Sequence, residues 1–379
     1  MKKVLFGAMA ALTLVACSND EVTDVTKSKE IKFTVSTGNA ETRAADSYCS
    51  NNLPASFKVW ANVEGKNYIE GETYKLQSGN NYVVDGANLR YWPASDIDFH
   101  AVVNEGGTTN WNAATGQLSF TGYTVATDVA QQKDFLYAVA AGCSKPDNGT
   151  GVQALNFRHA LAQVMFKGKC ENSKIYVEIS GVQICKIKNK GDFALPTAST
   201  DAKNINHGPS GWETSLASGN YGVWSNLSGS ETNAVSFAAT ALTDAGVNLT
   251  YTTDDHATNN IIYMVPQTLT PWEASNGGTK PAEQDGSYFL LTAKIWNVAG
   301  VAVDRDNDVV IYDGPIAIPT DNRVFEGGKR YVYTFIFTAG GNGGWTPDPV
   351  TPVLTPVKFT VTVDDFVEET NKDINTPNA

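Results

Sequence analysis

The sequence has few of the residues on which metal, redox and nucleotide chemistry depend. Its 379 residues include only four histidines and five cysteines. The histidines show no HxH, HxxxH or HExxH spacing and the cysteines no CxxC, the arrangements typical of zinc ligands. A GxSxG elbow, a P-loop and a GxGxxG after a strand are also missing, so the sequence offers no nucleophile elbow and no phosphate cradle. We therefore expect no metal, no cofactor and no enzymatic activity.

Positive charge is also scarce. The chain has 28 lysines and arginines against 40 aspartates and glutamates, which gives a formal net charge of −12. Proteins that bind nucleic acid need clustered Lys and Arg to meet the phosphates. We therefore expect no nucleic-acid partner, and the acidic balance favours a soluble surface protein.

Long apolar runs are confined to the first residues. Two lysines precede an apolar run from Val4 to Ala16, which is too short for a comfortable membrane span. The run ends in Leu14-Val15-Ala16-Cys17, which resembles a bacterial lipobox. We therefore expect residues 1–16 to be a lipoprotein signal peptide, and Cys17 to become the acylated first residue, carrying palmitate. An ordinary signal peptide with an incidental cysteine is the alternative.

Helical periodicity is weak throughout the chain. Only the stretch from Asp128 to Ala138 allows one or two helical turns. Short runs rich in β-branched and aromatic residues predominate, separated by turns of Gly, Asn, Asp and Pro. They include residues 56–63, 97–103, 175–179 and 331–337. This pattern predicts an all-β protein of antiparallel sheets packed as sandwiches.

Two turn-rich stretches divide the chain. The first covers residues 142–151, and the second is the Gly- and Pro-rich stretch 339–352. We expect a domain boundary at the first and an extended tether at the second. The predicted organisation is a signal peptide at 1–16, a lipidated propeptide with the first strand at 17–43, an N-terminal β-sandwich domain at 44–150, a C-terminal β-sandwich domain at 151–338, and a Gly/Pro linker with a further strand at 339–379.

One short pattern occurs twice. Ile31-Lys32-Phe33-Thr34-Val35-Ser36 near the start is matched by Val357-Lys358-Phe359-Thr360-Val361-Thr362 near the end. Both copies alternate apolar and polar residues, so each predicts a strand with one buried face. The buried side chains would be Ile31, Phe33 and Val35 in the first copy, and Val357, Phe359, Val361 and Val363 in the second.

Two strands with matching faces could occupy the same groove in turn. A polar stretch that contains Arg43 follows the first copy, so a cut there would release that copy from the body of the chain. This arrangement suggests a subunit that polymerises. The alternatives are a chance recurrence of a common β-pattern, and a C-terminal copy that simply closes the sheet of its own domain.

Several aromatic-rich segments follow one another in the body of the chain. They are residues 57–62, 91–93, 97–101, 133–138, 157–166 and 326–333. In order and rough spacing they resemble the fimbrillin-like proteins of the Bacteroidetes, the subunits of type V pili. The resemblance implies two transthyretin-like β-sandwich domains, transport as a lipoprotein, display on the outer membrane and in a fimbrium at the cell surface, and adhesion to a host or bacterial ligand.

The resemblance also implies a route of assembly. In such pilins an arginine-specific protease removes the lipid together with the first strand, and the C-terminal strand of another subunit fills the groove. Carried over to this sequence, the cut falls between Arg43 and Ala44, and the donor strand runs from Val357 to about Asp365. The implied partners are other pilin subunits, the protease, and the outer membrane until cleavage. Stalk, tip and anchor subunits share the fold, and an anchor would keep Arg43 uncut.

A monomeric surface lipoprotein that binds glycans or host ligands is the second hypothesis. The eight tryptophans could form platforms on which sugars stack, although sandwich cores explain most of them equally well. His159 lies in a strand-like run and is expected to be a packing or hydrogen-bonding residue. The disulfide pairing among Cys49, Cys143, Cys170 and Cys185 stays open.

Overall fold

A computed structural model describes residues 29–36, 53–145, 151–200, 222–250, 261–273, 279–298, 304, 307–338, 344–353 and 357–365. In these ranges the chain folds almost entirely into β-strands, with 3-10 turns at Val129–Gln131 and Pro281–Glu283. The predicted all-β fold is confirmed. The helical turn allowed between Asp128 and Ala138 is the one at Val129–Gln131. Within the described ranges, no helix has the length and apolar character that a membrane crossing requires.

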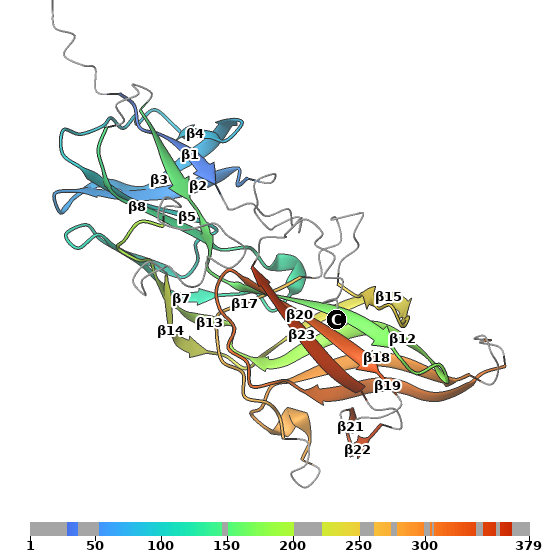
Figure 1. Ribbon diagram of the computed structural model, residues 1–379. Coiled ribbons are helices and arrows are strands. Elements are labelled where there is room, and N and C mark those ends of the chain that lie inside the picture. Colours follow the sequence, from blue (N-terminus) through green and yellow to red (C-terminus); the bar gives the residue numbers. More distant parts are fainter. Residues whose placement is uncertain are drawn as a thin grey trace, which may run out of the picture.

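The N-terminal half is built on an eight-stranded sheet, at the top of Figure 1. The strand order is β10-β8-β5-β2-β3-β4-β1-β9. Its members are β1 (Lys32–Ser36), β2 (Ser56–Val63), β3 (Lys66–Ser78), β4 (Asn81–Val84), β5 (Ile97–Val103), β8 (Leu136–Cys143), β9 (Val152–Asn156) and β10 (Arg158–His159).

A second, four-stranded sheet covers the outer face of the first. It contains β14 (Val223–Ser228), β13 (Lys190–Ala194), β7 (Gln117–Thr124) and β6 (Thr108–Asn112), in that order. Because both faces of the larger sheet are covered, β2 is buried at consecutive positions instead of alternate ones. Phe57, Val59 and Ala61 belong to the inner core. Trp60 faces the covering sheet, where its ring lies 6.4 Å from that of Phe120.

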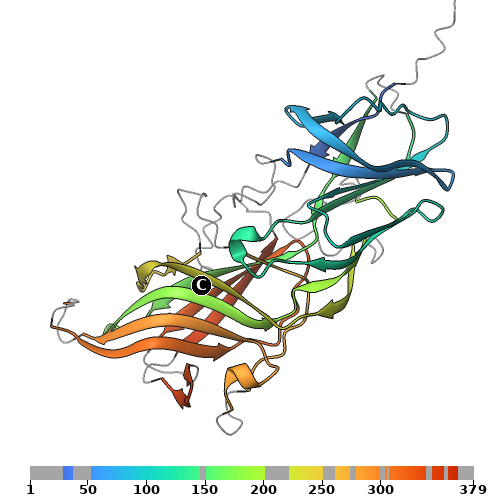
Figure 2. The ribbon, with the colours of Figure 1, turned by 180° about the vertical axis from the view of Figure 1, so that it is seen from behind.

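The C-terminal half is a sandwich of two sheets, seen from behind in Figure 2. Phe166, Phe289 and Phe335 meet edge-on or stacked in the core between them. One sheet has the order β16-β11-β20-β23, with β17 also paired to β11, and the other β15-β12-β18-β19-β21-β22. The bounds are β11 (Ala162–Cys170), β12 (Ile175–Ile187), β15 (Glu231–Ala241), β16 (Val247–Asn248), β17 (Ile262–Met264), β18 (Tyr288–Asn297), β19 (Val309–Pro319), β20 (Lys329–Phe337), β21 (Trp345–Pro347), β22 (Val350–Pro352) and β23 (Val357–Asp365).

Two strand pairs run parallel, whereas the sequence predicted antiparallel sheets. β1 is parallel to β9, and β11 is parallel to β20. Each pair joins segments that lie far apart in the chain. Local alternation sets which side chains face inward, but it carries no information about a distant partner or its direction.

Strands on both sides of residue 150 share sheets. β9 and β10, which follow residue 150, belong to the same sheet as β1 to β5 and β8. β13 pairs with β7 in the covering sheet. The chain therefore returns to the N-terminal half after β12, before β15 rejoins the C-terminal half. The division into domains at 150/151, and the transthyretin-like strand order, stay predictions.

The expected Gly/Pro linker contains a docked hairpin. β21 and β22 pair with each other, and Trp345 pairs with Ala317 of β19. The ring of Trp345 lies 6.0 Å from that of Trp272, and Lys280 forms an ion pair of 2.8 Å with Asp348. The tether predicted for residues 339–352 is thus fixed to the body of the sandwich along 345–352, because its tryptophan finds an apolar surface to cover.

Candidate strand-exchange site

Strand β1 is an inner member of the N-terminal sheet. Its neighbours are β4, which is antiparallel to it, and β9, which is parallel. On the β4 side, the N–H groups of Ile31 and Val35 donate to the carbonyls of Arg90 and Asn80, over 2.8 and 3.2 Å. On the β9 side, the N–H of Lys32 donates to the carbonyl of Gly151 over 3.1 Å. The first copy of the repeat therefore lies inside the fold, hydrogen-bonded along both edges.

Phe33 is the central anchor of β1. It is fully buried in an aromatic box formed by Phe57, Tyr74 and Phe99, at ring-centroid distances of 5.9, 4.7 and 5.1 Å. All three contacts are edge-to-face, the arrangement that aromatic quadrupoles favour. Ile31 and Val35 flank Phe33 and are buried as well. The inward orientation predicted for these three side chains is what the structure shows.

Gly151 lets the main chain of β1 come close to β9. Its φ of +72° lies in the left-handed region, and a Cβ at this position would meet the carbonyl oxygen of Glu30 at 2.6 Å. The indole of Trp92 donates to the carbonyl of Gly151 over 2.9 Å. Only glycine fits here without displacing the main chain that leads into β1. The sequence analysis placed Gly151 in a turn and did not assign it to the site.

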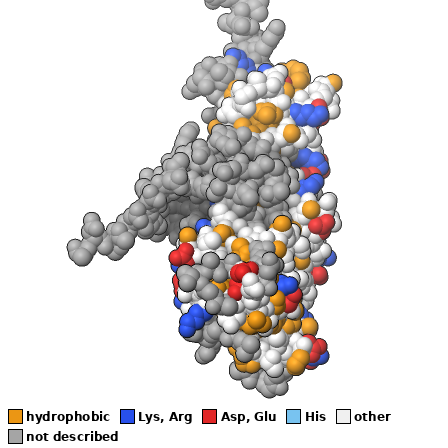
Figure 3. All heavy atoms as spheres, turned by 90° about the vertical axis from the view of Figure 1, so that its right-hand side faces the viewer, with side chains coloured by type: hydrophobic (Ala, Val, Ile, Leu, Met, Phe, Trp, Pro, Cys, Tyr) orange, Lys and Arg blue, Asp and Glu red, His pale blue; other side chains and the backbone are white. Residues whose placement is uncertain are grey.

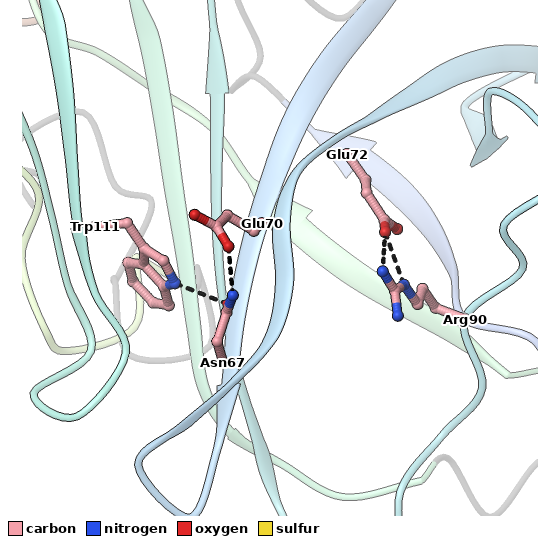
Figure 4. Close-up of polar contacts among 5 residues, drawn as sticks. All are labelled: Asn67, Glu70, Glu72, Arg90 and Trp111. Atoms are coloured by element: carbon pink, nitrogen blue, oxygen red, sulfur yellow. Dashed lines mark hydrogen bonds and ion pairs between the residues drawn. The ribbon is translucent and has the colours of Figure 1, made fainter.

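An ion pair fixes the loop that borders β1. The guanidinium of Arg90 donates from Nε to Oε1 of Glu72 over 2.7 Å, and from Nη2 to the same oxygen. This hydrogen bond raises the pKa of Arg90. In Figure 4 the two side chains point toward each other, while Asn67 links Glu70 and Trp111 further along the same strand. The carbonyl of Arg90 accepts the hydrogen bond from the N–H of Ile31. The ion pair therefore holds in place one edge of the groove that β1 occupies, which we call the seat of β1.

The second copy of the repeat lies at the edge of the C-terminal sandwich. β23 pairs with β20 over nine residue pairs, from Phe337↔Val357 to Lys329↔Asp365. It ends its sheet in the described part of the chain, so only one of its edges is hydrogen-bonded there. Val357 is fully buried, Phe359 and Val361 are partly buried, and Val363 is 43% exposed.

Cys17, Arg43 and Ala44 lie outside the described residues. Their roles in lipidation and cleavage stay predictions from the sequence. The two copies of the repeat do not contact each other in the described structure. Each copy packs on apolar residues in a different sheet of the same chain.

The histidines that the structure describes lie in two separate places. Nδ1 of His159 lies 2.8 Å from Oδ2 of Asp134, in agreement with a packing and hydrogen-bonding role. His100 is buried between the two N-terminal sheets, beside Trp111, and burial lowers its pKa to about 4. Among the described residues, no three His, Cys, Asp or Glu side chains gather as metal ligands. The expected lack of metal, cofactor and catalysis stays a prediction.

The surface offers no platform of tryptophans in the described part of the chain. The tryptophans there, of which Trp212 is not one, are all buried or half-buried. Figure 3 shows one face of the molecule, on which acidic, basic and apolar side chains are interspersed. Cys170 and Cys185 are not joined by a disulfide.

Comparison with known proteins gives a family match over most of the chain. A family model described as fimbrillin-like matches residues 42–365, a range that begins after β1 and ends with β23. No curated protein matches. Among solved structures, a fimbrial protein from Bacteroides vulgatus ATCC 8482 shares 12% identity, covering 88% of this chain and 98% of that chain, with a TM-score of 0.49. A fimbrilin from Porphyromonas gingivalis W83 shares 12% identity over 90% of this chain and 98% of that chain, with a TM-score of 0.43.

Proposed function

The chain belongs to the fimbrillin-like family, and from this premise we propose that it is a structural, non-enzymatic pilus subunit that assembles by exchange of a β-strand. One observation carries the proposal. β1 is bonded along both edges and buried on its inner face, yet it joins the rest of the chain through the segment that contains Arg43. A single cut at Arg43 separates β1 from the body of the protein.

The first steps concern export and cleavage. The precursor reaches the outer membrane as a lipoprotein, acylated at Cys17. An arginine-specific protease then hydrolyses the bond between Arg43 and Ala44, and residues 17–43 leave with the lipid. Until that cut, β1 prevents premature assembly because it covers two sheet edges that would otherwise pair with any available strand.

Loss of β1 leaves a groove that favours refilling. Ile31, Phe33 and Val35 are buried to 0, 0 and 3% exposure. At roughly 1.5–3 kcal/mol for each buried side chain, their removal uncovers apolar contacts worth about 5–9 kcal/mol. The donor is β23 of another subunit, which adds main-chain hydrogen bonds and alternate apolar side chains to the open edges.

The donor starts from a weaker position than the strand it replaces. In its own subunit β23 has one hydrogen-bonded neighbour, and its apolar side chains become more exposed toward Val363. The free energy needed to release β23 from its own subunit is therefore smaller than the free energy gained from its contacts in the groove of the next subunit. The assembled fimbrium would lie at the cell surface and serve adhesion to a host or bacterial ligand.

Proteolysis of the purified precursor tests this function. Arginine-specific protease should convert it into a ladder of oligomers that resists SDS and dissociates on boiling. Arg43→Ala and truncation after Thr355 should both leave monomers. Arg305 also lies in a polar stretch but far from the first copy of the repeat, so the matched change Arg305→Ala should leave the ladder intact. A ladder that persists in both blocking variants would reject strand exchange. A native protein recovered from cells with Arg43 uncut would instead indicate an anchor subunit.

Glycan binding through tryptophan platforms is not proposed, because no tryptophan in the described ranges is exposed.

A further inference from the structure

Polar side chains lie buried between the two N-terminal sheets. Asn62 of β2 and His100 of β5 are 7% and 1% exposed. Oδ1 of Asn62 and both ring nitrogens of His100 have no hydrogen-bond partner among the described residues. Burial of a polar atom without a partner costs free energy, and most buried polar atoms in proteins have one. These atoms therefore indicate a partner from outside the chain.

The turn between β6 and β7 is the point at which these atoms meet. Gly116 has a φ of +63°, and a Cβ at this position would lie 3.4 Å from Oδ1 of Asn62 and 3.8 Å from Cε1 of His100. Cε1 is bonded to both ring nitrogens. The backbone of Gly116 also approaches the imidazole, without reaching hydrogen-bond geometry. The lack of a side chain at residue 116 thus leaves space between the amide oxygen and the ring.

The chemistry of these groups selects the partner. Nδ2 of Asn62 donates to Oδ2 of Asp98 over 3.2 Å, so Oδ1 is the atom that needs a donor. Burial lowers the pKa of His100 to about 4, so at neutral pH the ring is uncharged and one of its nitrogens is an N–H donor. The partner must therefore donate to the amide oxygen and accept from the ring.

Ions do not meet this requirement. A halide or a carboxylate has no hydrogen to donate to Oδ1 of Asn62, and it would lie close to the carboxylate of Asp98. A metal cation would leave the N–H group of His100 without an acceptor. In the described part of the chain, no three His, Cys, Asp or Glu side chains gather as metal ligands. Water both donates and accepts, and it is small enough for a space that one glycine provides.

We infer that Asn62, His100 and Gly116 form a binding site for buried water, in which one molecule donates to Oδ1 of Asn62 and accepts from the ring of His100. Buried waters in proteins serve polar groups that the chain itself leaves without partners. The water connects β2, β5 and the turn after β6, so it joins the larger sheet to the sheet that covers it. This inference is independent of the proposed strand exchange.

Trp111 of β6 packs against the site. Its ring lies 5.3 Å from that of His100. The indole N–H donates to Oδ1 of Asn67 over 3.0 Å, and Nδ2 of Asn67 donates to Oε2 of Glu70 over 2.6 Å (Figure 4). These bonds hold the half-buried indole beside the fully buried imidazole. We therefore expect the water to exchange with solvent slowly.

Magnetic resonance on the purified precursor tests the site directly. The chain has only four histidines, so selective carbon-13 labelling of histidine resolves the C–H group at Cε1 of His100, and the variant His100→Gln assigns it. We expect a nuclear Overhauser contact between this proton and a water molecule of long residence time. Absence of that contact in the wild-type protein would overturn the inference. A crystal structure in which a protein group bonds to Oδ1 of Asn62 would also overturn it.

Gly116→Ala fills the site with a methyl group. Contacts of 3.4 and 3.8 Å are ordinary van der Waals distances, so the methyl group displaces the water without a clash. Gly79→Ala is the matched control, because Gly79 has a φ of +58° and no described heavy atom lies within 4 Å of its Cβ position. Both variants carry the strain of alanine at a positive φ.

Gly116→Ala should lose the water contact, and Gly79→Ala should keep it. Urea unfolding should show an unfolding equilibrium constant that rises roughly fivefold or more in Gly116→Ala beyond the rise in Gly79→Ala, because the amide oxygen and the ring lose their partner. Equal rises in the two variants would overturn the inference. A water contact that persists in Gly116→Ala would do the same. If Gly116→Ala does not fold, the measurement on the wild-type protein decides.

Discussion

β1 and β23 carry nearly the same sequence pattern in two different surroundings. β1 has a strand on each side, and its inward side chains are 0–3% exposed. β23 has one neighbour, and its burial declines from Val357 at 0% to Val363 at 43%. Because hydrophobic stabilisation follows the area removed from water, the same residues contribute more in the seat of β1. The proposed strand exchange therefore needs no donor with a stronger apolar pattern, because the groove that holds β1 encloses the same pattern more fully.

The largest expected effect comes from the two equivalent phenylalanines. Phe33→Ala should destabilise the precursor by about 3–5 kcal/mol, the usual cost of emptying a buried aromatic site. Phe359→Ala should cost the unassembled subunit less, because Phe359 is only partly buried. Urea unfolding of both variants measures the difference. Equal losses of stability in the two variants would contradict the claim that Phe33 is buried more fully than Phe359.

Acid should weaken the N-terminal sheet that holds β1. His100 is buried, with a pKa of about 4 in the folded protein against an ordinary value of 6.5. Between these values the unfolded chain binds the proton and the folded chain does not, so stability falls as the pH falls from 6.5 to 4, by up to about 3 kcal/mol. Thermal unfolding at pH 7 and pH 4.5 measures the loss, and His100→Gln should remove the part that belongs to this residue. An unchanged pH dependence in His100→Gln would refute the assignment.

Gly151→Ala should loosen β1 specifically. The new Cβ would meet the carbonyl oxygen of Glu30 at 2.6 Å, and the left-handed backbone adds strain. We expect a loss of about 1–3 kcal/mol. Gly142→Ala is the matched control, because Gly142 also has a positive φ of +64° but nothing lies within 4 Å of its Cβ position. Chemical unfolding compares the two; a Gly142→Ala variant that loses as much would show that backbone conformation, not the approach of β1, accounts for the effect.

The smallest effect is expected at the far end of the donor. Val363→Asp should change the stability of the unassembled subunit by less than about 0.5 kcal/mol, as exposed substitutions usually do. It should also leave the oligomer ladder unchanged, whereas Val357→Asp should abolish the ladder. Electrophoresis of protease-treated variants checks both outcomes. Loss of the ladder in Val363→Asp would show that the donor contact includes Val363.

Much of the fold follows from local patterns. A β-branched and aromatic composition identified β2 and β5. Alternation identified both copies of the repeat, because side chains of a strand point to opposite faces at every second residue. The same rule identified Ile31, Phe33 and Val35 as inward residues. It did not identify Tyr74, Phe99 or Gly151 as their surroundings, since these positions come from strands and turns elsewhere in the chain.

The hairpin at residues 345–352 is a second case in which local patterns did not predict a contact with a distant part of the chain. Its glycines and prolines indicated a free tether, yet Trp345 docks beside Trp272 and pairs with Ala317. Val353 is buried in the C-terminal core, so in the proposed exchange only the residues after Val353 would move with β23. The sequence contained the tryptophan, but not the apolar surface that receives it.

The amino-acid order by itself determined which side chains of the two copies point inward, because the two-residue period of a strand is a local property. Only the tertiary structure decided that one copy lies between two strands and the other at an edge. Sheet partners are chosen by contacts between distant segments, and those contacts set how much apolar surface each copy buries.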